Sequence, residues 1–348
     1  MTPIISVCVP TYNGSAFFQE CIDSILSQTF SDFELLIVDD RSSDRTVEIA
    51  QAYASKDARI TVIENPQNLG LVENWNRCIE LSQCEWIKFV FQDDKIASNC
   101  LERMLEESTL DCDFVFCRRN FVFEASVSEA KRKEFSFFLD LDKVLPGNTR
   151  ISAYEYCQAV INQPWLNIIG EPTSSMIRKR VFDKFGVFNP NLIQICDLEF
   201  WHRVASNRGI TLIRESLATF RIHDRSTTAK NHDSHNYRMS LDFLILLHDF
   251  AYHPAYQNLR LFCTKQPNVD ISELIIKETY SSWQRGKKII KIQPQDKQEI
   301  EKVWDELIQK YPRFASIKKL SLLKRARYRV APRLEAIKHR LNSLLKSM

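Results

Sequence analysis

Two adjacent carboxylates, Asp93 and Asp94, follow the apolar run Trp86 to Phe91 after a single glutamine, Gln92. The bulk of that run is typical of a strand buried on both faces, so the acids should emerge at its carboxyl end. Paired acids at such an edge can hold a divalent cation through oxygen ligands, and a cation there would attract phosphates. The alternative is that Gln92 to Asp94 form a polar loop and cap the helix expected from near Ser98. The pair alone does not decide between the two.

The elements that must position these acids alternate between buried strands and amphipathic helices. Such alternation favours βαβ units and a parallel sheet with right-handed crossovers. Ligands bind outside the carboxyl ends of strands in sheets of this kind, so the polar residues at those ends should converge on one crevice. Convergence favours the functional interpretation of the acid pair. The expected strands are Ile4–Val9, Glu34–Val38, Arg59–Ile63 and Trp86–Phe91, and the polar clusters are Pro10 to Asn13, Asp39-Asp40 and Asp93-Asp94.

The composition is ordinary for a large soluble globular protein. The 348 residues are 44% hydrophobic and 26% charged, which suits one large domain with an appendage, or two domains. A net charge of +3 is too small to indicate nucleic-acid binding. The ten cysteines are scattered through apolar runs without close pairs, so we expect reduced thiols in a cytosolic protein. No signal peptide and no membrane-spanning run is recognised.

The last third of the chain has a different sequence pattern from the first two thirds. Helices are expected after Ser226, and the segment 320–348 is basic with leucine and isoleucine interleaved among Lys and Arg. Such a tail either lies on an anionic membrane surface or is a docked or dimerising helix with a solvated basic face. Nucleic acid is not favoured, because no known reading module accompanies the charge. Residues 121–150 give no readable pattern.

Six sequence segments follow one another along the chain: SVCVPTYNG, CIDSILSQTFSDFELLIVDDRSSDRT, NLGLVENWN, IKFVFQDD, GEPTSSMIRKRVFDKFGVFNPNLIQICDLEFWHRV and FRIHDRS. Taken in order, these segments resemble family 2 glycosyltransferases, which have the nucleotide-diphospho-sugar transferase fold called GT-A. The resemblance covers residues 1–225, and it implies a Rossmann-like, mostly parallel central sheet with helices on both faces. It places nucleotide-sugar binding in 1–110 and the acceptor and catalytic part in 111–225, with 226–348 as a helical C-terminal region.

The resemblance assigns donor contacts to the ends of the first strands. A tyrosine ring can stack on a nucleotide base, and a carboxylate can accept a hydrogen bond from a base N–H or a ribose hydroxyl. The residues placed against the base and ribose are Pro10, Tyr12, Asp40, with Asp39 close by, and Asn68 or Asn76 closing the pocket.

Asp93 and Asp94 match the metal-binding acidic motif of the family. Asp94 is the expected direct ligand of Mg²⁺ or Mn²⁺, with Asp93 nearer the ribose or the ligand shell. Phe91 replaces the first acid of the common D-x-D form, which leaves the number of protein ligands open. His223 resembles a histidine that closes the site in relatives. It is either a metal or phosphate contact or a loop residue that forms hydrogen bonds.

Asp197 aligns with the catalytic base of the family, and Cys196 precedes it where glutamate is more usual. One carboxylate that deprotonates an acceptor hydroxyl suffices for single displacement with inversion. The alternative for Asp197 is an ordinary acid in the first turn of a helix. Its place in ICDLEFWHR, after GEPTSS, favours the base. Glu171, Thr173 and Ser174 resemble contacts to the acceptor or the diphosphate.

The sequence therefore predicts a metal-assisted inverting glycosyltransferase. It would move sugar from a nucleotide diphosphate donor, a UDP-sugar, to a hydroxyl of a glycan or lipid-linked glycan in surface polysaccharide assembly. We expect a cytoplasmic protein at the inner face of the membrane, and a homodimer is compatible with the tail. One alternative is a sugar-phosphate nucleotidyltransferase, although PTYNG stands where those enzymes carry a Gly- and Arg-rich loop. A catalytically silent nucleotide-sugar-binding module is the other, and Phe91 and Cys196 keep it open.

Overall fold

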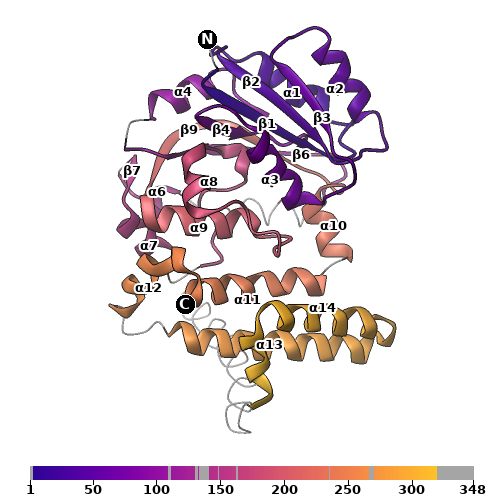
Figure 1. Ribbon diagram of the computed structural model, residues 1–348, viewed down its shortest axis with the longest axis vertical. Coiled ribbons are helices and arrows are strands. Elements are labelled where there is room, and N and C mark those ends of the chain that lie inside the picture. Colours follow the sequence, from indigo (N-terminus) through magenta and orange to yellow (C-terminus); the bar gives the residue numbers. More distant parts are fainter. Residues whose placement is uncertain are drawn as a thin grey trace. The chain divides into compact units, whose positions relative to one another are not determined.

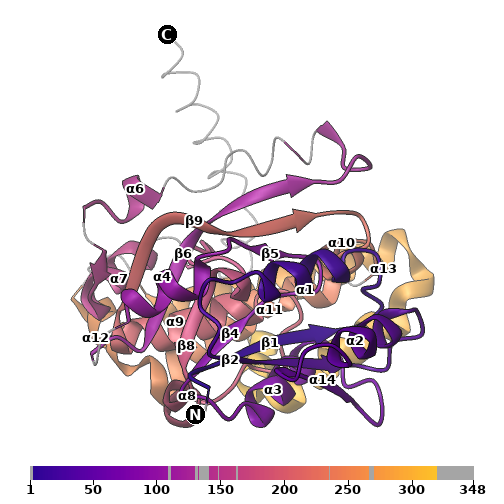
Figure 2. The ribbon, with the colours of Figure 1, turned by 90° about the horizontal axis from the view of Figure 1, so that it is seen from above.

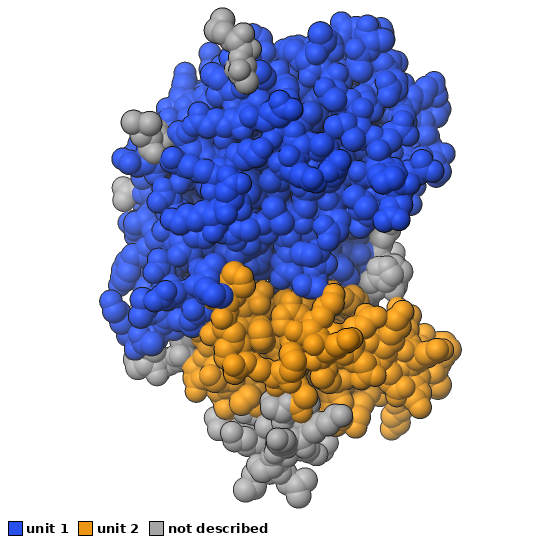
Figure 3. Space-filling model, in the orientation of Figure 1, with its two compact units in different colours: residues 1–231, 254–265 blue, residues 232–253, 266–348 orange. Residues whose placement is uncertain are grey.

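The chain folds into two compact units. The computed structural model describes residues 3–108, 111–129, 132, 141–147, 149–161, 164–234, 236–265 and 270–319. Unit 1 comprises residues 1–231 and 254–265, and unit 2 comprises 232–253 and 266–348 (Figure 3). The basic tail at 320–348 lies outside the described residues, so its membrane and docked-helix alternatives remain expectations.

Unit 1 begins with a parallel half-sheet, as the alternating sequence pattern predicts. Strands β1 (Ile5–Thr11), β2 (Phe33–Asp39), β3 (Ile60–Glu64) and β4 (Trp86–Phe89) are arranged in the order β3-β2-β1-β4, and each pair is parallel. Thr11 pairs with Asp39 and Asp39 pairs with Glu64. The carboxyl ends of these strands therefore meet at one edge of the sheet.

Helices cover both faces of this half-sheet. Side chains of α1 (Phe18–Leu26) and Ala50 of α2 (Thr46–Ala54) share a buried cluster with alternate strand residues such as Val7 and Ile37. Helix α3 (Leu71–Leu81) lies on the opposite face, where Cys8 Sγ is 3.9 Å from the main-chain oxygen of Cys78. Strands buried on both faces explain the continuous apolar runs in the sequence.

Antiparallel β8 (Ser175–Arg178) joins β4 to the second half of the sheet, where long β6 (Phe114–Phe123) and β9 (Ile210–Ile222) run side by side (Figure 2). Short β5 (Lys95–Ile96) and β7 (Arg150–Ile151) pair antiparallel with β9. Strand β9 is continuous from Ile210 to Ile222, and irregularities in its register with β6 around Arg118 accommodate the polar residues in its middle.

Several other helices of unit 1 pack against α9 (Cys196–Arg208), which is buried along almost its whole length. Two of its charged residues pair with each other, since Arg203 bonds Glu199 at 2.9 Å. Tyr256 donates to the main-chain oxygen of Glu199 at 2.7 Å, which ties residues 254–265 to unit 1. The other elements are α4 (Cys100–Glu106), α6 (Leu141–Val144), α7 (Ala153–Val160), η1 (Pro172–Ser174), α8 (Lys179–Phe185), α10 (Thr227–Ser234), η2 (Pro254–Tyr256) and α12 (Gln257–Thr264).

Unit 2 is helical, as the sequence predicts, and contains α11 (Asn236–Tyr252), α13 (Ile271–Ile292), η3 (Pro294–Asp296), α14 (Lys297–Lys310) and η4 (Pro312–Lys319) (Figure 1). Helices α11 and α13 pack closely at Gly286, where an added Cβ would lie 2.7 Å from the Tyr237 hydroxyl. Among the described residues, no helix combines the length and the apolar character needed to cross a bilayer.

Candidate active site

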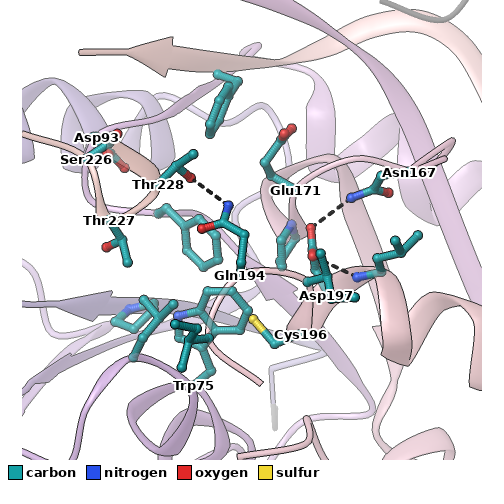
Figure 4. A pocket seen from close by; sticks show the side chains of 18 of the residues that line it. Trp75, Asp93, Asn167, Glu171, Gln194, Cys196, Asp197, Ser226, Thr227 and Thr228 are labelled. Carbon is teal, nitrogen blue, oxygen red and sulfur yellow. Dashed lines mark hydrogen bonds between the residues drawn. The ribbon is translucent and has the colours of Figure 1, made fainter. Parts of the chain in front are cut away.

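A cavity of about 330 Å³ opens in unit 1 at the carboxyl edge of the sheet (Figure 4). Its walls come from segments far apart in the sequence, as the convergence of strand ends predicts. The apolar wall includes Trp75 and Phe91, whose rings stack with centroids 4.7 Å apart. The polar residues that line it are Gln92, Asp93, Asn167, Glu171, Gln194, Asp197, Arg221, Ser226, Thr227 and Thr228.

Asp197 lines this cavity from the first turn of α9. One carboxylate oxygen accepts from the Leu198 N–H at 2.7 Å and the other from the Asn167 side-chain amide at 2.9 Å. Burial, reinforced by the charge of Glu171, raises the pKa of Asp197 to about 7. The two hydrogen bonds and the charge of Arg119 oppose that rise. A carboxyl group titrating near neutrality can accept a proton efficiently.

Asn167 holds Asp197 from a loop that is itself fixed. The amide oxygen of Asn167 accepts from the Gly170 N–H at 2.8 Å, and the Gly170 carbonyl accepts from the Trp201 indole at 2.8 Å. Gly170 has φ of 93°, and a Cβ there would overlap the Arg119 guanidinium. Sequence reasoning missed Asn167, because no motif or spacing distinguishes it from other polar loop residues.

Glu171 also lines the cavity, and Arg119 of β6 holds it in an ion pair of 2.6 Å between Nε and Oε2. Both side chains are mostly buried, so this pair is little screened by solvent. Thr173 and Ser174, which follow in η1, do not line the cavity. The Ser174 hydroxyl is buried and donates within its own loop to the carbonyls of Ile169 and Glu171, each at 2.8 Å.

Asp93 is the acid of the pair that lines the cavity, and its carboxylate lies 2.9 Å from His223 Nε2. His223 is only 7% exposed, and its Nδ1 has no hydrogen-bond partner among the described residues. Asp93 and His223, each expected separately near the metal site, therefore contact one another, and the role of each stays a prediction.

Asp94 is buried and does not line the cavity. One of its oxygens accepts from the Thr173 hydroxyl at 2.6 Å, and the other accepts from the Arg221 N–H at 3.1 Å. Burial and the neighbouring charge of Asp93 raise the pKa of Asp94. Its hydrogen bonds join the end of β4 to η1 and β9. We expected Asp94 as the direct metal ligand, but this geometry favours Asp93.

The acids at the end of β2 are buried and fully engaged by the protein. Asp39 accepts from the hydroxyls of Thr11 at 2.8 Å and Ser42 at 2.6 Å. Asp40 accepts from the Asn65 side chain at 2.9 Å and from the N–H groups of Leu69 at 2.7 Å and Gly70 at 2.8 Å. In this arrangement both acids fix the loops around the site, and neither lines the cavity.

Of the other residues predicted for the base and ribose, Pro10 lines the cavity and three lie outside its lining. Tyr12 is 46% exposed, and its backbone exchanges hydrogen bonds with the Gln92 side chain at 2.9 and 3.1 Å. Asn68 donates to the carbonyl of Asp40 at 2.9 Å. Asn76 bonds both the N–H and the carbonyl of Phe188, each at 3.0 Å, so it anchors that segment.

The residues around Asp93 fit a cation site in which the protein supplies only some of the ligands and substrate phosphates and water supply the rest. In the described part of the chain, no three His, Cys, Asp or Glu side chains gather to hold a metal ion. Asp93 and His223 form a two-residue group with one orphaned ring nitrogen. Mg²⁺ characteristically binds through one or two carboxylates plus substrate phosphates and water. The pair suits such an open site and does not suit an all-protein cage.

Comparison with known proteins identifies the family. The model of "Glycosyl transferase family 2" matches residues 6–186. The chain is 43% identical over 118 residues to the uncharacterized glycosyltransferase EpsJ of Bacillus subtilis, an alignment that covers 34% of each protein. S. aureus TarS 1–349 in complex with UDP-GlcNAc superimposes with a TM-score of 0.53 at 17% identity, over 80% of each chain.

A second solved structure has the same fold. The mannosyltransferase PcManGT from Pyrobaculum calidifontis, in complex with GDP-Man and Mn²⁺, superimposes with a TM-score of 0.51 at 13% identity, over 79% of each chain. At these identities the superpositions establish the architecture alone. The predicted mixed α/β sheet with helices on both faces and a helical C-terminal region is confirmed. The chain belongs to glycosyl transferase family 2 and is a glycosyltransferase of the GT-A fold.

Proposed function

We propose that the protein transfers a sugar from a UDP-sugar to an acceptor hydroxyl by single displacement with inversion. The observation that carries this proposal is Asp197, a carboxyl group in the cavity whose pKa is raised to about 7. As the base, it would take the proton of the hydroxyl as that oxygen attacks the anomeric carbon. The nucleotide diphosphate leaves from the opposite face of the sugar.

The cavity supports a single displacement better than a covalent intermediate. Its second acid near Asp197 is Glu171, which is held by Arg119 at 2.6 Å. An ion-paired carboxylate is a poor nucleophile, because its negative charge is already stabilised. Glu171 instead influences Asp197 through its charge.

Asp93 and His223 are the residues we assign to a divalent cation, Mn²⁺ or Mg²⁺. A cation bound there would neutralise the negative charge that develops on the diphosphate leaving group. The Mn²⁺ complex of PcManGT supports the use of a cation in this fold. The complex of TarS with UDP-GlcNAc supports a UDP-sugar as donor. A glycan or lipid-linked glycan in surface polysaccharide assembly remains the acceptor that we propose.

Replacing the base tests this function. Asp197→Asn keeps the size of the side chain but cannot accept the proton, so turnover should fall by roughly 10² to 10⁴. UDP binding, measured by calorimetry, should stay nearly unchanged. The readout is UDP release from UDP-glucose, UDP-galactose and UDP-GlcNAc, with proton NMR of the anomeric configuration of the product. Asp183→Asn, a change at an exposed acid of α8, is the matched control.

Two results would contradict the proposal. Undiminished turnover in Asp197→Asn would remove this residue as base, and retention of configuration would exclude the single displacement. If the native protein binds UDP but releases none from the three donors, the result favours the alternative of a catalytically silent nucleotide-sugar-binding module.

A further inference from the structure

The loop that carries Asn167 also carries Trp165, an indole 60% exposed to solvent at the cavity. Other tryptophans of unit 1 are in the core, and Trp75, Trp86 and Trp201 are at most 5% exposed. Leaving so much apolar surface in water gives up burial free energy of about 25 cal/mol for each Å². The indole of Trp165 therefore presents apolar surface to solvent beside the candidate base.

The backbone on the amino-terminal side of Trp165 is anchored to α9. His202 is fully buried, and its Nε2 lies 2.9 Å from the carbonyl oxygen of Pro164. Burial lowers the pKa of His202 to about 4, so the ring is neutral near pH 7. Nε2 must then carry the proton and donate it to Pro164, while Nδ1 accepts from the Tyr156 hydroxyl at 3.0 Å.

The backbone on the other side of Trp165 is anchored as well. Asn167 bonds Asp197 at 2.9 Å, and Gly170 is held by the Trp201 indole at 2.8 Å. Trp165 therefore sits between two attachment points on the same buried helix that carries Asp197. Its backbone therefore belongs to an anchored loop, and an anchored loop loses little conformational entropy when a ligand binds.

We propose that Trp165 is the aromatic platform of the acceptor subsite and that it takes a pyranose ring. The C–H face of the sugar would stack on the indole, and hydroxyls at the ring edge would donate to Glu171 and Asp197. An indole matches an apolar ring face, and carboxylates are strong acceptors for hydroxyl donors. This inference rests on the proposed function, because Asp197 as base marks the acceptor side of the cavity.

Saturation-transfer NMR tests the platform without requiring turnover. The probes are methyl β-D-glucopyranoside and methyl β-D-galactopyranoside, added to the full chain in the presence of UDP. We expect saturation of the ring C–H protons with the native protein. Trp165→Ala should weaken the affinity by about 3- to 10-fold, the range of one aromatic contact, and Trp165→Phe should weaken it less.

Tyr154→Ala is the matched control. Tyr154 is also 60% exposed in unit 1, but it packs against Phe262 with ring centroids 5.1 Å apart and does not line the cavity. Pyranoside binding should be unchanged in this variant. Thermal melts of all variants verify that each one folds, because Trp165 contributes little to the core.

Three outcomes would overturn the platform: no saturation transfer to either pyranoside with the native protein, equal affinity in native and Trp165→Ala, or an equal loss in Tyr154→Ala. Failure of the platform is distinguishable from failure of the proposed function. Loss of turnover in Asp197→Asn without pyranoside binding removes the platform alone. Pyranoside binding that depends on Trp165, combined with full turnover in Asp197→Asn, removes the base and leaves the platform.

Discussion

Asp197 illustrates at the residue scale how burial prepares a carboxyl group for proton transfer. Its pKa of about 7 lies well above the ordinary value of 3.8, mainly because burial disfavours the charged form. Because its pKa is raised, the native state binds more protons than the unfolded chain between about pH 4 and pH 7. The free energy of unfolding therefore falls as the pH rises through that window, and above about pH 7 the ionised, buried carboxylate destabilises the fold by a constant amount.

We therefore predict that Asp197→Asn makes the protein more stable while making it less active. At about pH 8 the gain in unfolding free energy should be of the order of 2 kcal/mol, because a neutral amide avoids the cost of a buried charge. At about pH 4 the gain should largely vanish, since the native carboxyl group is then protonated. Urea unfolding at the two pH values measures both. A gain that is independent of pH would mean that ionisation of Asp197 is not its source.

The charge of Glu171 should set the acid limb of the activity profile. Because Glu171 raises the pKa of Asp197, Glu171→Gln should lower that pKa and move the limb to lower pH. The native limb should lie near pH 7. The pH dependence of donor turnover measures the shift, and Glu64→Gln, at an exposed acid of β3, is the control. If the acid limb of the activity profile stays at the same pH in Glu171→Gln, Asp197 does not control that limb.

Asp93 and Asp94 should differ in their effect on the cation. We predict that Asp93→Asn abolishes the tightening of UDP binding by Mn²⁺, because Asp93 lines the cavity beside His223. Asp94→Asn should preserve most of that tightening, since Asp94 bonds Thr173 and the Arg221 backbone. Calorimetry with UDP, with and without Mn²⁺, compares the two. The reverse pattern would restore Asp94 as the direct ligand.

At the scale of elements, strand ends create the site and buried polar residues fix the loops between them. Apolar runs with helical segments between them were enough to predict β1 to β4 and the edge where they converge. Their loops could not be predicted in the same way. Asp40 follows a strand just as Asp93 follows one, yet Asp40 is enclosed by Asn65, Leu69 and Gly70. Sequence position locates an acid at the edge, and packing decides whether it faces the cavity.

The second half of the site shows the same limit. Asp197 was predictable from its motif, whereas Asn167 and Arg119 act through contacts across the sheet and from a loop without a motif. The antiparallel strand β8, which brings these segments together, also left no periodic pattern in the sequence. A run of four buried residues is too short to identify a strand or its direction.

The loop at Gly170 should be sensitive to a single methyl group. Gly170→Ala would place Cβ against the Arg119 guanidinium and strain a φ of 93°, so both stability and donor turnover should fall. Gly147→Ala is a matched control, because Gly147 has φ of 84° and open space around the added Cβ. The excess loss at Gly170, measured by urea unfolding, reports the contact with Arg119. Equal losses of stability in Gly170→Ala and Gly147→Ala would mean that backbone strain alone accounts for the effect.

At the scale of the whole molecule, the basic segment 320–348 is the remaining candidate for membrane contact. Deleting it should move the protein from anionic phosphatidylserine vesicles to the supernatant in sedimentation, because Lys and Arg near such a surface each contribute about 1 kcal/mol. Neutral phosphatidylcholine vesicles provide the control. Equal sedimentation with and without the segment would favour the docked-helix alternative.

The return of residues 254–265 to unit 1 affects the order in which the protein can be made. Tyr256 donates to the main-chain oxygen of Glu199 in the first turn of α9, the helix that presents Asp197. During synthesis this bond cannot form until α11 of unit 2 has left the ribosome, because α11 precedes Tyr256 in the chain. The catalytic unit therefore completes its folding only after part of its neighbour has been translated. A fragment ending at residue 231 would lack the hydrogen bond from Tyr256 to Glu199 of α9.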